Sequence, residues 1–340
     1  MNALKRWAVL AFTALGSHGA LAQNAPDSVV RIHRMDPVLL AQATEQQKRQ
    51  HATGAEPIGV LFPDIGEPFR RQFTEIIDGI EDQTRLRVRG YPISPNQDIG
   101  ELSTSLKRSG TRVVIALGRQ GFKAAGSLDA PMGIVVSGMS SVPDGDRQIG
   151  ICLTPDPSLL FSQLKALLPA ARRVIVVYNP QNNDWLIKIA REAARAQGLE
   201  LLAYEARDLA SAARAYEAAF ATADSHHDAL WLPTDPTTVD ESTILPLVLR
   251  ESWNRNVPFF SSSLLHVRRG ALFALYPNNL ELGRNLANMA LGMLAGENQR
   301  KGVVPLREVR TALNTRTASH FGLNIGTRAQ RAFDYLYPEP

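Results

Sequence analysis

The chain has 340 residues, of which 44% are hydrophobic and 21% charged, and its formal net charge is +4. These values are typical of a soluble globular protein with about two domains of ~150 residues each. No long basic run with interleaved aromatic residues occurs, which argues against nucleic acid as a partner, and the single cysteine, Cys152, cannot form an internal disulfide.

The first 22 residues have the pattern of a secretory signal peptide. Lys5 and Arg6 precede an apolar run over 7–15, and the small-residue site Ala20-Leu21-Ala22 follows. The run is shorter than the ~20 residues of a membrane-spanning helix, and no cysteine follows the site to carry a lipid. The sequence therefore predicts a periplasmic protein without direct membrane insertion after cleavage. An uncleaved N-terminal anchor is the alternative.

Residues 23–55 are polar and form a predicted N-terminal extension. From Pro57 onward, apolar runs alternate with segments of helical spacing, which predicts parallel strands covered by helices on both faces. The predicted strands of this first unit are 58–62, 86–91, 113–117 and 132–137, and the predicted helices are 69–80, 99–106 and 121–125. Cys152 lies in a further apolar run and is expected to be a buried, unreactive thiol.

The same pattern restarts after Pro169. The predicted strands are 173–178, 199–206, 229–232 and 257–260, and the predicted helices are 185–197, 210–223 and 244–254. The last predicted elements, a strand at 270–275, a helix at 280–294 and a strand at 303–309, are too few for a third core. We therefore expect them to complete the two sheets, with lobe 1 formed by 56–155 plus 266–302 and lobe 2 by 156–265 plus 303–335.

Polar residues follow the predicted strands, and in doubly wound sheets ligands bind beyond the carboxyl ends of the strands. The corresponding loops span 63–66, 118–121, 137–141, 179–184, 234–237 and 261–263, and they are rich in Gly, Ser, Asn, Asp and Thr. Such loops can form hydrogen bonds to a small polar ligand bound between two lobes.

Catalytic and cofactor motifs are missing from the sequence. It contains no G-x-S-x-G elbow, Walker loop, G-x-G-x-x-G or H-E-x-x-H helix. His226, His227 and Asp228 form the best metal-like cluster, but their spacing is poor for a metal site. The sequence therefore predicts no enzyme activity, no metal and no cofactor.

Four segments resemble the type I periplasmic binding proteins, and specifically the ABC transporter substrate-binding protein family that includes aromatic amino acid binders. They are 113–118, 168–180, 228–235 with 257–260, and a fourth set of runs at 270–272, 282–287 to 294–296, and 313–318 with 321–323. The resemblance covers about residues 57–330. Arg119 departs from it, because small residues are more usual at that point of the loop.

The resemblance implies an α/β protein with two doubly wound parallel-sheet lobes joined by a hinge that closes on a ligand. The hinge is expected near 154–156, 263–265 and 302–304. It also implies an inner-membrane permease as partner. A sensory binding protein that signals to a membrane kinase or cyclase is the first alternative, and an exported enzyme is the second.

The expected ligand is small, anionic or zwitterionic, and similar to an amino acid. A helix beginning near Gln120 would direct its free amides at the ligand, and Arg119 could bind a carboxylate. Asn179, Asp235 and Ser261 would supply polar contacts from the second lobe, and Asp235 could accept from a ligand amine. The remaining expected ligand-binding residues are Phe62, Asp64, Gly118, Ser137 and Tyr276. Each of these side chains could instead simply pack or face solvent.

Overall fold

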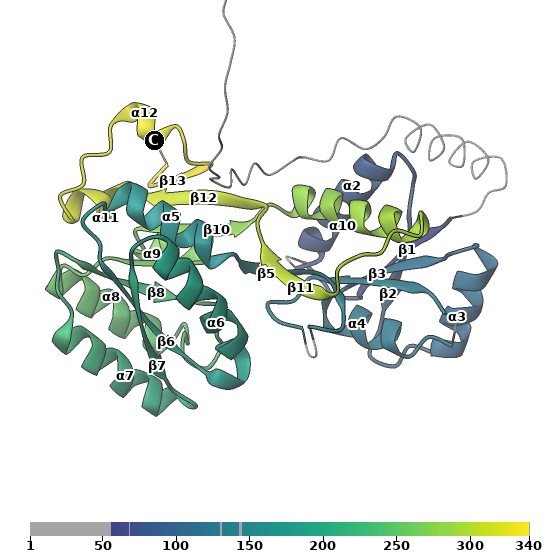
Figure 1. The fold of residues 1–340 in the computed structure, drawn as a ribbon, viewed down its shortest axis with the longest axis horizontal. Helices are drawn as coiled ribbons and strands as arrows, with labels where there is room; N and C mark the ends of the chain where they lie inside the picture. The colour runs from purple at the N-terminus through teal and green to yellow at the C-terminus, as the bar shows by residue number, and fades with distance from the viewer. Residues whose placement is uncertain (1–55, 68, 130, 143–144, 340) are drawn as a thin grey trace, which may run out of the picture. The chain divides into compact units, whose positions relative to one another are not determined.

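A computed structural model describes residues 56–67, 69–129, 131–142 and 145–339. The predicted signal peptide and the polar extension lie outside the described residues. The described chain forms a six-stranded and a seven-stranded sheet, each with helices on both faces (Figure 1). The predicted fold class, α/β with two doubly wound parallel-sheet lobes, is confirmed.

The first sheet is parallel throughout and has the strand order β11-β5-β4-β3-β1-β2. Its strands are β1 (Ile58–Pro63), β2 (Arg89–Ile93), β3 (Val113–Leu117), β4 (Gly133–Ser137), β5 (Ile149–Pro155) and β11 (Gly302–Leu306). The helices are α2 (Phe69–Thr84), α3 (Ile99–Arg108), α4 (Gly118–Gly126) and α10 (Asn279–Leu294). The strand order reverses between β1 and β3. In doubly wound sheets, ligands bind next to the carboxyl ends of the two strands at such a reversal.

The second sheet has the strand order β13-β12-β10-β9-β8-β6-β7, and only β10 and β12 pair in an antiparallel manner. Its strands are β6 (Arg173–Tyr178), β7 (Glu200–Glu205), β8 (Asp228–Leu232), β9 (Phe259–Ser261), β10 (Phe273–Pro277), β12 (Val309–Asn314) and β13 (Tyr335–Tyr337). The helices of this part are α5 (Pro157–Leu167), α6 (Pro180–Ala196), α7 (Leu209–Thr222), α8 (Ile244–Arg255), α9 (Leu264–Arg269), α11 (Thr315–His320) and α12 (Thr327–Gln330). Here the order reverses between β6 and β8.

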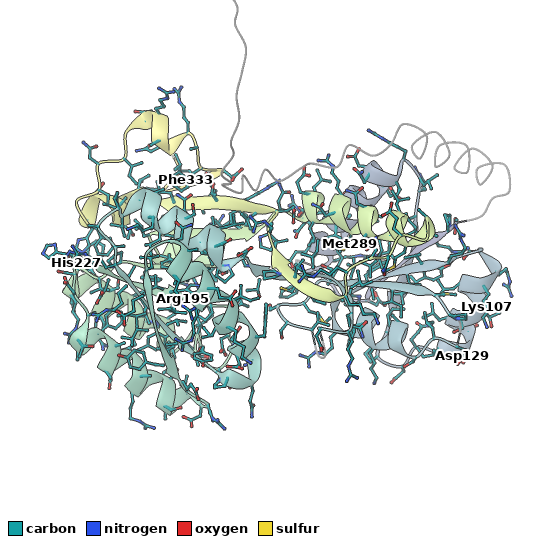
Figure 2. The ribbon with its side chains drawn as sticks, viewed as in Figure 1. Lys107, Asp129, Arg195, His227, Met289 and Phe333 are labelled. Carbon is teal, nitrogen blue, oxygen red and sulfur yellow. The ribbon has the colours of Figure 1, made fainter. Side chains whose placement is uncertain are left out.

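The inner strands β3, β6 and β8 are buried on both faces over most of their length, which explains their largely apolar sequences. Alternate residues of a strand point to opposite faces, so Ala229 and Trp231 of β8 pack into one core of the second sheet while Leu230 and Leu232 pack into the other. Side chains fill the space between each sheet and its helices (Figure 2). The two-sided burial makes each sheet the middle layer of three.

Helix starts follow the polar residues after the strands. The side chains of Asp98, Asp156, Asn179 and Asp208 each accept a backbone N–H in the first turn of α3, α5, α6 and α7, respectively. These residue types are the preferred N-caps because they satisfy amides that have no partner within the helix. No helix among the described residues is long and apolar enough to span a membrane.

Helices α2 and α10 cross at two glycines. A Cβ on Gly79 would lie 2.1 Å from the carbonyl oxygen of Leu280, and a Cβ on Gly283 would lie 2.1 Å from that of Ile76. Neither position therefore has room for a side chain. The contact holds α10, a late segment of the sequence, on the first sheet.

The late elements complete both sheets as predicted, but the boundaries differ from those expected. β10 belongs to the second sheet, although 266–302 was assigned to lobe 1, and α10 and β11 then belong to the first. The predicted strand at 303–309 is in fact two strands, β11 and β12, one in each sheet. The apolar pattern alone does not reveal that Arg307 and Glu308 separate them.

The chain passes between the two sheets three times, near Asp156, near Asn278 and at 307–308. The amide of Asp156 donates to the carbonyl of Leu306 at 2.8 Å, and that of Asn278 donates to the carbonyl of Glu308 at 2.9 Å. Of the expected hinge positions, 154–156 coincides with a crossing. The position at 302–304 lies a few residues early, and 263–265 is wrong because it lies between β9 and α9 within the second sheet's part of the chain.

Candidate functional site

Neighbouring strands of the first sheet bring Gly118 and Ser137 together. Gly118 begins α4 with a φ of +67°, and a Cβ on it would lie 2.9 Å from the Pro63 ring at the end of β1. A Cβ on Gly138, which follows Ser137, would lie 2.7 Å from the amide nitrogen of Gly118. Glycine is needed at this close approach, since larger residues rarely adopt positive φ. The Ser137 hydroxyl is fully buried and donates to the carbonyl of Ile151 at 2.7 Å.

The first turn of α4 carries polar groups without partners. Arg119 is exposed and forms no salt bridge with any described residue. The Oε1 atom of Gln120 is buried and has no hydrogen-bond partner among the described residues. Asp64 is exposed in the loop after β1. This turn therefore presents free helix amides, a cation and an unsatisfied acceptor at one edge of the first sheet.

The two aromatic candidates pack against their own sheets. Phe62 contacts β2, where a Cβ on Gly90 would lie 3.0 Å from its ring, and it is partly buried against the core of the first sheet. Tyr276 is partly buried against a core of the second sheet. Burial raises the pKa of its phenol.

Asp235 is the centre of a hydrogen-bond network at the carboxyl ends of β6 and β8. Its buried carboxylate accepts five donors: the amides of Asn179, Thr237 and Thr238 and the side-chain amides of Asn182 and Asn183, at distances from 2.7 to 3.4 Å. The predicted neighbours Asn179 and Asp235 are thus in direct contact. Both carboxylate oxygens are occupied within the lobe, so Asp235 orders the first turn of α6.

Ser261 is part of a second network, at the carboxyl end of β9. Its hydroxyl oxygen lies 2.7 Å from Nδ1 of His266, and Nε2 of His266 lies 3.0 Å from Oε1 of Glu241. Arg269 Nη1 donates to Oε2 of Glu241 at 2.7 Å. Ser261 and His266 are both buried. Burial lowers the pKa of His266, while its hydrogen bond to Glu241 opposes that shift.

The composition of this network resembles a hydrolytic serine–histidine–carboxylate triad, but its geometry differs. Ser261 is fully buried and its oxygen also accepts the amide of Ser263 at 2.9 Å. A nucleophile needs a free lone pair and access to substrate. The network is therefore suited to holding the 261–263 segment. The neighbouring Ser262 hydroxyl is buried without a partner among the described residues.

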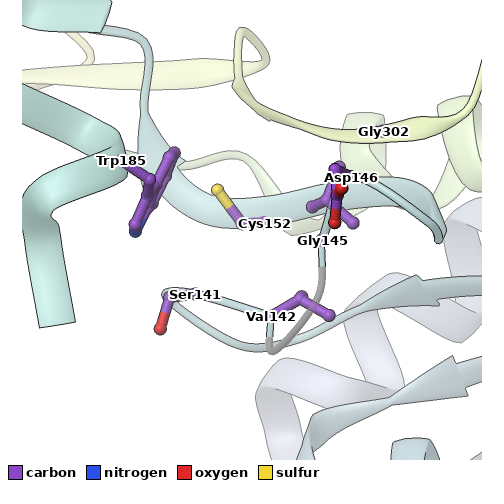
Figure 3. A pocket seen from close by; sticks show the side chains of 8 residues that line it. Ser141, Val142, Gly145, Asp146, Cys152, Trp185 and Gly302 are labelled. Atoms are coloured by element: carbon purple, nitrogen blue, oxygen red, sulfur yellow. The ribbon is translucent and has the colours of Figure 1, made fainter. Parts of the chain in front are cut away.

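A cavity of about 430 Å³ lies beside β5 and β11. It is lined by Ser141, Val142, Gly145, Asp146, Cys152, Trp185, Gly302 and Val303. Figure 3 shows the Trp185 ring and the Cys152 thiol on its wall. Trp185 Nε1 donates to the carbonyl of Asn182 at 3.1 Å, so the network of Asp235 also orients this ring. None of the ten sequence-predicted site residues lines the cavity.

Cys152 is buried as expected, with 1% of its surface exposed. Burial raises the pKa of its thiol to about 11. The thiol is therefore protonated at neutral pH and is a poor nucleophile.

The metal-like cluster of the sequence lies at the start of β8, at the amino ends of the strands of the second sheet. Asp228 forms an ion pair with Arg173, and Asp224 Oδ2 lies 2.8 Å from Nδ1 of His227. His226 lines a cavity of about 430 Å³ together with His320. No group of three or more possible metal ligands occurs among the described residues.

Sequence reasoning missed Glu241, His266 and Ser262. Glu241 and His266 lie 25 residues apart in sequence, in a loop and in a short helix that the sequence analysis did not identify. Trp185, the first residue of the predicted helix 185–197, was not among the expected ligand-binding residues. The only signal in the sequence was the Ser261-Ser-Ser263 run. It indicates the end of a strand, but it does not indicate that His266 contacts this run.

Comparisons with known proteins agree with this architecture. Residues 160–328 match the family model described as "ABC transporter substrate binding protein". An ABC domain from Streptococcus pneumonia, solved in complex with L-Trp, is 17% identical, with a TM-score of 0.53 and coverage of 83% of this chain and 99% of that one. No curated protein matches the sequence.

Two further solved structures have the same fold. CD0873, a ligand-free, open substrate binding protein with adhesive properties from Clostridium difficile, is 16% identical, with a TM-score of 0.60 and coverage of 82% of this chain and 98% of that one. A conserved domain protein from Vibrio cholerae is 15% identical, with a TM-score of 0.51 and coverage of 83% and 99%. At these identities, the similarity concerns the fold.

Proposed function

We propose that this protein, which has the fold of the type I periplasmic binding proteins and matches the ABC transporter substrate-binding family over residues 160–328, delivers a small solute to a membrane permease. The protein is exported to the periplasm by its N-terminal signal. The solute binds between the carboxyl ends of the two sheets and is released unchanged. We favour transport over a sensory function because the matching family is one of transporter components.

The observation that carries this proposal is the pair of doubly wound sheets with polar, strand-end loops at both reversals of strand order. Ligands of such sheets bind at these reversals. In the first sheet the loop after β3 leads into α4 with Arg119 and Gln120, and in the second sheet the loops after β6 and β8 are fixed by Asp235. The first sheet therefore supplies polar groups without partners among the described residues, and the second supplies loops held in place by hydrogen bonds to Asp235.

We propose that the solute carries a carboxylate, as an anionic or zwitterionic compound similar to an amino acid. Arg119 has no acidic partner among the described residues, and a guanidinium binds a carboxylate through two parallel hydrogen bonds. The amides of the first turn of α4 add a second favourable interaction with an anion. Asp235 has no free oxygen for a ligand amine, so we assign it no ligand contact.

A thermal-shift screen of amino acids, small carboxylates and nucleosides tests the proposal. L-Trp is the first compound to include, because the Streptococcus pneumonia domain was solved with it. A compound present at 100 times its Kd stabilises the folded protein by about 2.7 kcal/mol. We expect carboxylate compounds to give the largest shifts.

Arg119→Ala and Arg112→Ala form a matched pair for this test. Both arginines are exposed, but Arg119 follows β3 at its carboxyl end and Arg112 precedes it at its amino end. We expect R119A to weaken carboxylate binding at least tenfold and R112A to leave it unchanged. Equal affinities in the two variants would reject the assignment of Arg119, and turnover of any screened compound would reject a pure binding function.

A further inference from the structure

The orientation of the Ser261 hydroxyl follows from its neighbours. Its oxygen accepts the amide of Ser263 at 2.9 Å, so its hydrogen is free to point at Nδ1 of His266, 2.7 Å away. Nδ1 is then the acceptor, and the ring hydrogen lies on Nε2, where it donates to Glu241 at 3.0 Å. The network therefore requires neutral His266 in one tautomer.

We propose that His266 is a positioning residue for solute binding, which holds the segment 261–263 in place through the Ser261 hydroxyl and releases it when protonated. This inference rests on the proposed function in one respect, because it takes this strand-end segment as part of the wall that faces the solute. The Ser262 hydroxyl is the group that would be positioned, since it is buried and has no partner among the described residues.

Two charged groups act on the His266 ring. Glu241, from the loop before α8, favours the protonated ring, and Arg269, on α9 itself, disfavours it. The other charged groups of the surrounding elements have different partners: Arg268 of α9 donates to the hydroxyl of Tyr335, and Arg310 of β12 acts on Tyr276. Burial is the largest influence and lowers the pKa of His266 below 6.5.

Protonation changes the hydrogen-bond count at Ser261. A proton on Nδ1 turns His266 from an acceptor into a donor, so the Ser261 hydroxyl hydrogen loses its only acceptor in the network. Because Ser261 is fully buried, water does not replace that acceptor. The hydroxyl hydrogen left without an acceptor favours another Ser261 rotamer, and we expect the hydrogen bond from the Ser263 amide to be weakened when that rotamer forms.

Hydrogen–deuterium exchange of the full-length protein between pH 7.5 and 4.5 tests this chain of events. The readout is the Ser263 amide, corrected for the intrinsic pH dependence of exchange. We expect strong protection at pH 7.5 and at least a tenfold loss of protection on acidification, with a midpoint below 6.5. Constant protection over the whole range would overturn the proposal. The measurement needs no solute, so its outcome is independent of whether the screen finds one.

Two substitutions separate positioning from simple packing. In H266N the side-chain oxygen replaces Nδ1 as the acceptor, so we expect protection that no longer changes with pH. In H266Q the amide lies nearer Nε2, so protection should be low at every pH. H266N retains Glu241, and a wild-type pH response in this variant would overturn the proposal because another group would then be titrating.

H226N is the control for loss of a histidine elsewhere, since His226 is exposed before β8. It should keep the wild-type pH response. If H266Q does not fold, S261A gives the same test, because it removes the hydroxyl that accepts the Ser263 amide. Full protection of the Ser263 amide in S261A would also overturn the proposal.

Discussion

Asp235 shows how one buried side chain can order the loops at the ends of two strands. Its carboxylate is 3% exposed and joins the ends of β6 and β8 to the first turn of α6. Hydrogen bonds to a charged acceptor are stronger than neutral ones, and several converge here. The residue that sequence reasoning assigned to the ligand therefore stabilises the loops around it.

Removing this carboxylate should destabilise the fold strongly. We expect Asp235→Ala to lower the free energy of unfolding by about 3–5 kcal/mol, because a buried donor left without an acceptor costs about 1–3 kcal/mol and only those donors that water does not reach bear this cost. Urea denaturation measures the change. Asp184→Ala is the control, since Asp184 forms an exposed i,i+4 pair with Lys188 that contributes only about 0.3–0.5 kcal/mol. Similar losses in both variants would contradict the role given to Asp235.

Cys152 provides a second prediction at this scale. Its pKa is raised from 9.0 to about 11, so at pH 8 the folded protein holds about a hundredfold less thiolate than the unfolded chain. Burial further limits access of a reagent. Reaction with a thiol reagent such as DTNB should be at least a hundredfold slower in the folded protein than in guanidinium chloride. A difference below tenfold would show that the thiol is not buried in solution.

The contact between α2 and α10 shows why a helix can demand glycine. Gly79 and Gly283 allow the two backbones to approach so closely that a Cβ would overlap a carbonyl oxygen of the facing helix. Helix propensity alone would favour alanine at both positions. Packing against the neighbouring helix overrides that preference.

Alanine at either glycine should therefore be destabilising. We expect Gly79→Ala or Gly283→Ala to cost about 2–3 kcal/mol, since overpacking of a tight contact forces the backbones apart. Gly126→Ala is the matched control: it lies at the end of α4 with nothing within 4 Å of its Cβ position, and it should be stabilising by about 0.5–1 kcal/mol. Thermal melts followed by circular dichroism distinguish the two outcomes.

Helices and strands were predictable from the sequence where the pattern of apolar residues lies within the element itself. The strands 113–117 and 173–178 were placed correctly, because all their residues except Arg173 form continuous apolar runs. The boundary between β11 and β12 was missed. Arg307 and Glu308 are two polar residues within the predicted strand 303–309, and only the tertiary structure shows that the chain changes sheets there. Arg307 lies at a crossing between the sheets and forms an ion pair with Asp156. No short-range pattern contains that contact.

The candidate site was predictable in outline but not in detail. Strand-end loops rich in Ser, Asn and Asp were correctly placed at the carboxyl ends of β6, β8 and β9. Whether a side-chain oxygen in these loops remains free for a ligand depends on partners that are far apart in sequence. Ser261, for example, contacts His266, which in turn contacts Glu241. Asp235 and Ser137 both satisfy their hydrogen bonds internally, a result that only the assembled sheets determine.

For the whole molecule, we propose that the three crossings between the sheets in the described part of the chain act as a hinge when a solute binds. A ligand that contacts both lobes stabilises the closed arrangement in proportion to its difference in affinity for the two states. We expect the radius of gyration measured by small-angle X-ray scattering to fall when a tight-binding compound from the screen is added. Superimposable curves with and without it would contradict a closing motion.

Both sheets receive strands from the last 40 residues of the sequence, β11 in one and β12 with β13 in the other. During synthesis, a ribosome must therefore release almost the entire polypeptide before either sheet has its full set of strands. A chain that passes through a secretion channel must do so unfolded. If the protein is exported as we propose, the late synthesis of these strands would leave both sheets incomplete until the end of the chain has been made.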